Sequence, residues 1–157
     1  MSLDAAQRWP DQGVVGDLHW RLSTAADEAP LLAMMQAFYI EDRIVHDPRR
    51  IASALQALWS GPDHGAVLLL STAGGQPSEE PAQVAGYLAL SVCFSLEQGG
   101  RHALIDELYL GPSMRGRGLG GQALALARQW AVQAGLPALR LEGHRHYPRA
   151  KSLYGRA

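Results

Sequence analysis

The chain has 157 residues, of which 47% are hydrophobic and 18% are charged; this composition is typical of one globular domain and excludes a disordered chain. Fourteen basic and 15 acidic side chains leave a net charge of −1, which favours neither a polybasic nucleic-acid-binding surface nor a membrane-binding one. The single cysteine, Cys93, excludes both a disulfide framework within the chain and a multi-cysteine metal site.

The first half of the chain predicts a lead-in, two strands and two helices. Residues 1–17 show no hydrophobic period, so we expect a poorly ordered lead-in before a single domain over residues 18–157. Apolar residues recur at helical spacing after Asp27, a typical N-cap residue, and after Pro48, a typical first-turn proline. The predicted elements are a strand over 19–24, a helix over 27–40, a second helix from Pro48 to the residue before Gly61, and a strand over 66–70.

The second half predicts a hairpin, a glycine-rich turn and a helix. A strand over 84–96 and its partner over 102–110 are joined by Gly99-Gly100. The glycine-rich segment 111–121 leads into a helix over 122–134, followed by a strand over 138–142 and a helix over 150–154. Strands joined by hairpins are antiparallel. We therefore expect an α/β (α+β) domain with a mixed, mainly antiparallel central sheet flanked by helices.

The glycine-rich turn is the strongest functional signal in the sequence. Four of its glycines lie within six residues: Gly116, Gly118, Gly120 and Gly121. Two arginines, Arg115 and Arg117, lie beside the first of them. The first N–H groups of a helix have no intrahelical partner and lie at the positive end of the helix dipole. Glycine lets an anion approach them without meeting a Cβ atom. The pattern predicts a diphosphate-binding site; the alternative is a tight turn that needs glycine only for its backbone angles.

The same glycines also satisfy the G-x-G-x-x-G pattern of dinucleotide-binding folds, and Glu142 lies 21 residues beyond Gly121, where a ribose-binding acid is expected. Against this alternative, five residues separate Leu110 from Gly116 and only one further βα unit follows. The hairpins before the turn also disagree with a βαβ arrangement. A Walker A loop is excluded because the sequence contains no Gly-Lys-Ser/Thr.

Three motifs, in this order along the chain, resemble the GNAT family of N-acetyltransferases. Residues 115–120 are similar to that family's acyl-CoA signature Q/R-x-x-G-x-G/A, residues 105–112 resemble its fourth strand, and residues 150–154 resemble part of its later helix. The resemblance extends from about residue 19 onward. The segments IDELYL and FSLE are most similar to small-amine acetyltransferases of the spermidine/spermine type.

The sequence departs from the family pattern at two places. Tyr147 stands where the family usually has an asparagine that helps to hold the pantetheine arm of coenzyme A. The chain also stops at Ala157, where one or two final strands normally follow, so we expect those strands to be missing from the given sequence.

The resemblance implies direct acetyl transfer from acetyl-CoA to an amine and assigns residues to the cofactor. The pyrophosphate is expected on the backbone N–H groups of the glycine-rich turn, and the pantetheine arm on the strand edge before it. The expected cofactor-binding residues are Leu108, Tyr109, Leu110, Arg115, Gly116, Arg117, Gly118, Leu119, Gly120 and Gly121. Tyr154 matches the family's tyrosine, whose phenol would protonate the leaving thiolate; its alternative role is to pack on the sheet.

The acceptor amine requires a base, because an alkylamine with a pKa of about 10.4 is mostly protonated at pH 7. Asp106 and Glu107 are the catalytic candidates, with a structural salt bridge as the alternative for either. Neighbours in a regular strand point to opposite faces, so only one acid can face the acceptor unless a bulge turns the strand. In a regular strand Glu107 would share its face with Ile105 and Tyr109.

Substrate selection is expected from an acidic cluster that includes Glu41, Asp42 and Asp47, which would suit a small cationic amine; a solvated helix end is the alternative. No third metal ligand lies near His144 and His146, so no metal is expected.

Two other functions remain open from the sequence: a non-catalytic acyl-CoA-binding module and a protein or peptide N-acetyltransferase. We expect a small-molecule partner, no nucleic-acid or membrane partner, and a homodimer as a possible assembly. The N-terminus lacks the apolar stretch of a signal peptide, and no apolar run reaches the roughly 20 residues of a membrane span. The expected location is the cytoplasm.

Overall fold

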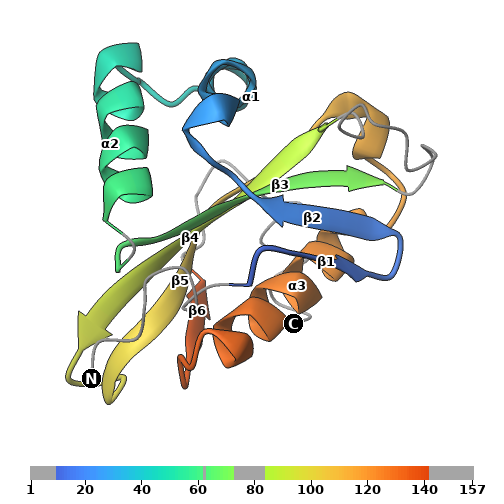
Figure 1. Cartoon of the computed structure of the whole chain (residues 1–157). Coiled ribbons are helices and arrows are strands. Elements are labelled where there is room, and N and C mark those ends of the chain that lie inside the picture. The colour runs from blue at the N-terminus through green and yellow to red at the C-terminus, as the bar shows by residue number, and fades with distance from the viewer. Residues whose placement is uncertain (1–9, 62, 73–83, 142–157) are drawn as a thin grey trace.

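The structure is a computed structural model that describes residues 10–61, 63–72 and 84–141. In this part of the chain six strands form one sheet in the order β1-β2-β3-β4-β5-β6 (Figure 1). Neighbouring strands are antiparallel from β1 to β5, whereas β6 runs parallel to β5. The strands are β1 Gln12–Val15, β2 Leu18–Leu22, β3 Gly65–Thr72, β4 Gly86–Ser95, β5 Gly100–Leu110 and β6 Leu139–Leu141. The predicted mixed, mainly antiparallel sheet is confirmed.

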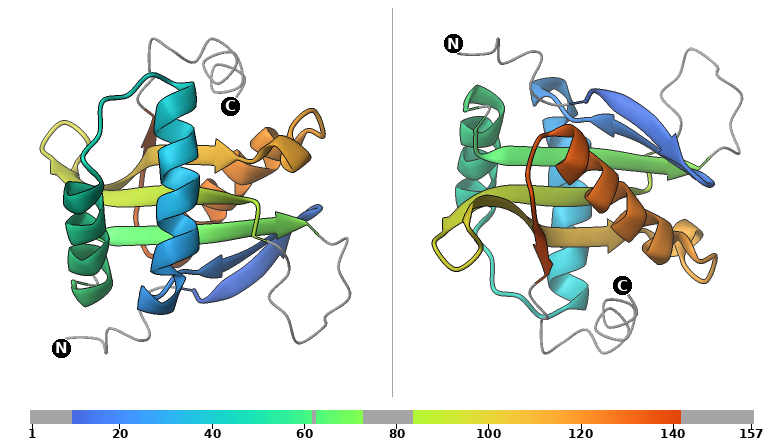
Figure 2. Two further views of the ribbon diagram at one scale, coloured as in Figure 1. Left: turned by 90° about the horizontal axis from the view of Figure 1, so that it is seen from above. Right: turned by 90° about the horizontal axis from the view of Figure 1, so that it is seen from below.

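Helices cover both faces of this sheet. The helices α1, Glu28–Glu41, and α2, Pro48–Ser60, lie on one face, and α3, Leu119–Gln133, lies on the other (Figure 2). Each face buries its own apolar cluster. The α3 side is centred on residues such as Leu88, Leu126 and Trp130, all fully or almost fully buried. The α1 side is rich in aromatic rings, among them Phe38 and Tyr87.

Local signals account for the helix boundaries. Pro48 occupies the first turn of α2, and the side chain of Asp47 caps it by accepting a hydrogen bond from the Arg49 N–H (3.0 Å). The predicted N-cap role of Asp27 is only half correct. Asp27 is the residue before α1, but its side chain makes no cap to that helix. It accepts hydrogen bonds from the Thr24 N–H and from Arg21 instead.

The expectation that residues 1–17 form a poorly ordered lead-in is wrong for residues 12–15. These residues form β1, which pairs antiparallel with β2 after a turn at Gly16 (φ +59°). The strand is half exposed at the edge of the sheet, so it has no run of apolar residues to reveal it. Its turn is held to α3 by a hydrogen bond of 2.9 Å from the Asp17 N–H to Gln122 Oε1.

The predictions for Glu142, His144, His146, Tyr147 and residues 150–154, which include Tyr154, lie outside the described residues. Within the described ranges, no helix has both the length and the apolar character needed to cross a membrane.

Candidate active site

A β-bulge in β5 sets the directions of the two candidate acids. On β4, Ala89 is the partner of Glu107 and Leu90 is the partner of Ile105, so Asp106 is an extra residue with no partner position on β4. A bulge of this kind shifts the alternation of side chains by one residue. The bulge that the sequence left open as an alternative is therefore present.

The bulge places the side chains of Glu107 and Ile105 on opposite faces of the sheet. Ile105 packs in the cluster on the α3 side, whereas Tyr109 packs in the cluster on the α1 side. Glu107 lies on the α1 side, as its hydrogen bond with Tyr39 of α1 shows. The expectation that Glu107 shares its face with Ile105 is wrong because of the register shift, and the expectation that it shares a face with Tyr109 is correct. Asp106 is exposed at the bulge.

The carboxylate of Glu107 is held between two phenols. Tyr39 Oη donates to Oε2 at 2.6 Å, and Tyr87 Oη donates to Oε1 at 2.8 Å. Burial raises the pKa of Glu107; the two phenol hydrogen bonds act in the opposite direction, and the nearby charge of Asp106 adds to the rise. Burial and the negative charge of Glu107 also raise the pKa values of Tyr39 and Tyr87, so both phenols stay protonated. The result is a carboxylate that is a stronger base than an exposed one.

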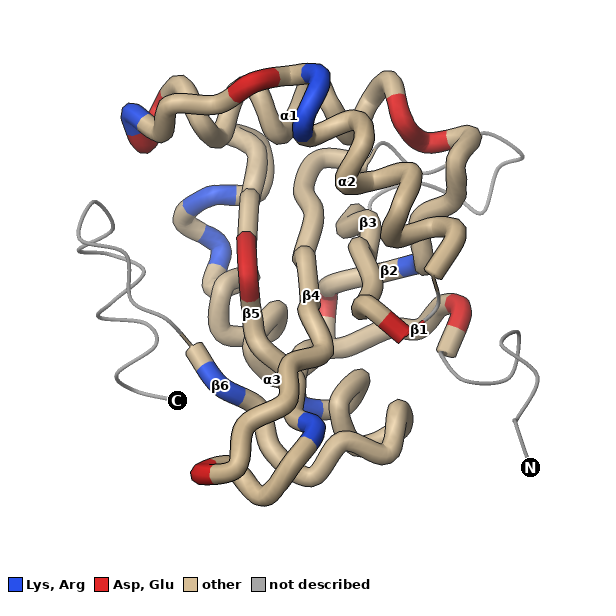
Figure 3. The backbone as a smooth tube through the Cα atoms, turned by 90° about the vertical axis from the view of Figure 1, so that its left-hand side faces the viewer, with Lys and Arg blue, Asp and Glu red and all other residues tan. Residues whose placement is uncertain are grey.

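A cleft of about 990 Å³ joins Glu107 to the glycine-rich turn. Its walls are the end of α1, the segment 42–47 and the start of α2 on one side, and β5 with the start of α3 on the other. Figure 3 shows the acidic segment of β5 with the region of α1 and α2 above it. The predicted site residues that line the cleft are Glu41, Asp42, Asp106, Glu107, Leu108, Tyr109, Leu110, Arg115, Gly116, Gly118, Leu119 and Gly120.

Two predicted cofactor residues, Arg117 and Gly121, are not among those that line the cleft. The guanidinium of Arg117 donates to the Ser113 carbonyl oxygen at 3.3 Å. Tyr39 lines the cleft, and Tyr87, which is not among the lining residues, donates a hydrogen bond to Glu107. Neither tyrosine was singled out from the sequence as a functional residue. Both residues have the spacing of ordinary core positions, so no local signal distinguishes them.

The turn before α3 has the shape that an anion-binding loop requires. Gly116 (φ +71°) and Gly118 (φ +73°) have left-handed backbones, which favour glycine. A Cβ atom at Gly116, Gly118 or Gly121 would meet no atom within 4 Å, so packing does not require glycine at these positions. The open space lies beside the first N–H groups of α3, which have no partner within the helix. These residues fit a diphosphate group.

Arg115 connects the turn to the end of α1. Its Nη2 atom donates to both carboxylate oxygens of Glu41, at 2.7 and 2.9 Å, and its Nε atom donates to the Leu110 carbonyl oxygen at 2.9 Å. The guanidinium also lies 5.9 Å from the centre of the Tyr109 ring. The Glu41 and Arg115 side chains are 44% and 46% exposed, so their ion pair contributes less than about 1 kcal/mol to stability. Glu41, predicted to bind substrate, is thus tied to the glycine-rich turn.

The cleft lining carries more acids than bases. Its acids are Glu41, Asp42, Asp47, Asp106 and Glu107, and its arginines are Arg50 and Arg115. His46 lies over the Tyr39 ring, with 5.0 Å between ring centres. Within the described residues, no group of three His, Cys, Asp or Glu side chains is arranged to hold a metal ion.

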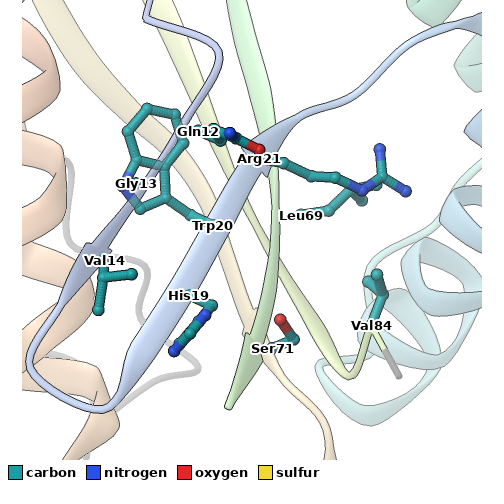
Figure 4. A pocket seen from close by; sticks show the side chains of 9 residues that line it. All are labelled: Gln12, Gly13, Val14, His19, Trp20, Arg21, Leu69, Ser71 and Val84. Atoms are coloured by element: carbon teal, nitrogen blue, oxygen red, sulfur yellow. The ribbon is translucent and has the colours of Figure 1, made fainter. Parts of the chain in front are cut away.

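A second hollow, of about 520 Å³, lies over the first three strands (Figure 4). Its charged residue, Arg21, is paired with both oxygens of Asp27, at 2.8 and 2.9 Å. The hydrogen bond from Arg21 lowers the pKa of Asp27, so this pair is already neutralised. None of the glycines of the turn before α3 lines this hollow. The larger cleft, which is lined by the Glu107 carboxylate and by the glycine-rich turn before α3, is therefore the candidate active site.

Comparisons with known proteins agree with this assignment. The family described as "Acetyltransferase (GNAT) family" matches residues 31–157. An uncharacterized N-acetyltransferase, YhfO of Bacillus subtilis (strain 168), is 30% identical over 134 residues, which are 85% of this chain and 82% of the relative.

Solved structures also share the fold. An integron cassette protein from the mobile metagenome of Cole Harbour Salt Marsh is 30% identical, with a TM-score of 0.67 over 84% of this chain and 81% of that one. A predicted acetyltransferase from Clostridium acetobutylicum, solved with acetyl-CoA, is 15% identical, with a TM-score of 0.68 over 88% of each chain. The family match over most of the chain, the fold and the cleft lead to one conclusion: the chain belongs to the GNAT family of acetyltransferases.

Proposed function

We propose that this acetyltransferase transfers the acetyl group of acetyl-CoA to the amine of a small cationic molecule, with Glu107 as the general base. Enzymes of the family use acetyl-CoA as co-substrate, and the Clostridium acetobutylicum protein was solved with it. The observation that carries the proposal is that the mostly buried carboxylate of Glu107 and the open glycine-rich turn line the same cleft.

Acetyl-CoA supplies an activated thioester, and this chain supplies the groups that orient it. The first N–H groups of α3 are suited to its diphosphate, and Arg115, which is paired with Glu41, lies in the same turn. Within the described residues, β6 pairs with β5 only at residues 103–105. The edge of β5 at residues 108–110 is therefore suited to the amides of the pantetheine arm. Tyr154 is proposed as the proton donor to the leaving thiolate, on the family resemblance.

The acceptor enters as an ammonium ion and must lose a proton before its nitrogen can attack the thioester carbon. The carboxylate of Glu107 takes this proton, directly or through a water molecule. The cleft lining holds five acids against two arginines, so the cleft attracts a cation more than it repels one. This charge balance supports a small cationic amine, of which polyamines are one class.

The test is a panel of acceptors with acetyl-CoA, read as thiol release. The panel contains diamines and polyamines, neutral amines, and peptides with free N-termini. We expect the cationic small amines to be the best acceptors. The substitution Glu107→Gln should lower kcat by about 100-fold or more, while calorimetry shows unchanged coenzyme A binding. Glu28→Gln, at the opposite end of α1, is the matched control.

A different experimental result would contradict each part of the proposal. A clear preference for peptides would show that the acceptor class is wrong. Full activity of the Glu107→Gln variant would show that another group takes the proton. Coenzyme A binding without turnover of any acceptor would indicate a binding module rather than an enzyme.

A further inference from the structure

We propose that Tyr39 and Tyr87 are positioning residues that act through Glu107: each phenol holds one carboxylate oxygen, and together they keep the base ionised and aimed at the acceptor. This inference rests on the proposed role of Glu107 as the base. It assigns a function in the reaction to two side chains that the sequence presents as ordinary core tyrosines.

The geometry is that of a clamp with three parts. Tyr39 comes from α1, Tyr87 from β4 and Glu107 from the bulged region of β5. The phenol of Tyr39 donates to Oε2 at 2.6 Å, and that of Tyr87 donates to Oε1 at 2.8 Å. Because each oxygen is held from a different element, the carboxylate cannot rotate without breaking a hydrogen bond. Each oxygen can accept more than one hydrogen bond, so the clamp still leaves room for the proton of the amine.

Aromatic packing fixes the two phenols. Tyr39 is 5% exposed and Tyr87 is fully buried. The ring of Phe38 packs edge-on against both, with ring centres 5.4 Å and 6.2 Å away. Tyr109 packs beside Tyr87 at 5.8 Å. The hydroxyl groups therefore hold their places before any substrate arrives, which is what a preorganised site requires.

The charges around Glu107 explain why the clamp is needed. Within the described residues Glu107 forms no ion pair. The titratable groups that contact it or line the same cleft are Tyr39, Tyr87, Tyr109, His46, Glu41, Asp42, Asp47, Asp106, Arg50 and Arg115. Burial and the Asp106 charge oppose ionisation, and the two phenols are the groups that favour it. A protonated Glu107 could accept fully from only one phenol, so the pair of donors favours the carboxylate over the acid.

The test is the pH dependence of kcat/KM for Tyr39→Phe, Tyr87→Phe and the double variant. Each substitution removes one hydroxyl and keeps the ring. A hydrogen bond to a charged group corresponds to about one pK unit. We therefore expect the acidic limb of the profile to move up by about one pH unit in each single variant and further in the double variant. Leu55→Val is the control, because it loosens the same apolar cluster from α2 without removing a hydroxyl or a ring, and its acidic limb should not move.

A second measurement separates this inference from the proposed base. The titration of Glu107 is followed by carbon NMR in the free enzyme labelled at its glutamate carboxyl groups, with the signal assigned by its loss in Glu107→Gln. Urea unfolding confirms that each variant is folded. A carboxyl titration that stays in place in both phenylalanine variants would overturn the clamp, whatever the kinetics show. If the titration moves but the acidic limb persists in Glu107→Gln, the clamp is upheld and the role of Glu107 as base is wrong.

Discussion

Glu107 combines two properties that oppose each other at the scale of a single residue. Burial raises the pKa of Glu107, so its carboxylate is a stronger base than an exposed one. The same burial makes the ionised form unfavourable for the folded protein. The two phenols reduce this penalty without removing it, because the pKa of Glu107 is still raised. Sites of catalysis often carry such a local loss of stability.

Replacing Glu107 by Gln should therefore stabilise the protein at pH 8 while lowering its activity. A glutamine can accept from one phenol and donate to the other, so no buried group loses its partner. The pKa of Glu107 is higher in the folded protein than in the unfolded chain, so between these two values the folded protein binds more protons. The stability of the wild-type protein then falls as the pH rises through this window, and the glutamine variant avoids that loss.

The measurement is the free energy of unfolding in urea at pH 5, 6.5 and 8. The advantage of Glu107→Gln should be largest at pH 8 and should shrink toward pH 5. Glu28→Gln is again the control and should show no such trend. A variant that is less stable than the wild type at pH 8 would contradict the assignment of a raised pKa to this carboxylate.

At the scale of elements, β5 and α3 together build the site. One extra residue in β5 turns Glu107 toward α1 and leaves Ile105 in the core on the other side. The helix α3 begins beside the cleft at Gly118 and ends near Gly135. These two glycines have almost the same φ angle, +73° and +74°, and a Cβ atom at either would meet nothing within 4 Å.

This pair of glycines offers a matched experiment. Alanine at either position should lower the free energy of unfolding by about 1 kcal/mol, because a left-handed backbone is unfavourable for a residue with a Cβ atom. Only Gly118→Ala should weaken the binding of coenzyme A, by about tenfold or more, because only Gly118 lies at the proposed phosphate loop. Isothermal calorimetry measures the affinities. Equal affinities for the two variants would refute the proposed location of the diphosphate.

At the scale of the whole molecule, the cleft runs between the α1–α2 side of the sheet and the start of α3, so an occupant contacts elements from both halves of the chain. A ligand that binds only the folded protein stabilises it by RT ln(1 + [L]/Kd), so the gain continues to grow after the site is filled. At 100 times its dissociation constant the gain is about 2.7 kcal/mol. For a protein of this size, that gain corresponds to a rise in melting temperature of roughly 5–10 °C.

Thermal unfolding in the presence of coenzyme A tests this expectation. The melting temperature should rise with ligand concentration, and Gly118→Ala should show a smaller rise than Gly135→Ala at the same concentration. A melting temperature that does not respond to coenzyme A in well-folded protein would remove the basis for the proposed reaction.

The features that could be predicted before the structure was known are those that depend on neighbouring residues. The helical spacing after Pro48, the hairpin around Gly99-Gly100 and the glycine-rich turn before α3 are all local, because capping, turn geometry and side-chain periodicity act over a few residues. Together with the motifs that resemble the GNAT family, they were enough to predict the type of sheet and the family.

Which side chains come into contact could be learned only from the folded chain. The bulge at Asp106 could be allowed for but not placed, because it depends on how β5 pairs with β4. Edge strand β1 carries no apolar pattern and exists because β2 offers it a partner. Tyr39 lies 68 residues and Tyr87 lies 20 residues from Glu107 along the chain, yet both phenols reach one carboxylate. Contacts of this kind result from the packing of a helix against two strands. The spacing of residues along the sequence does not predict that packing.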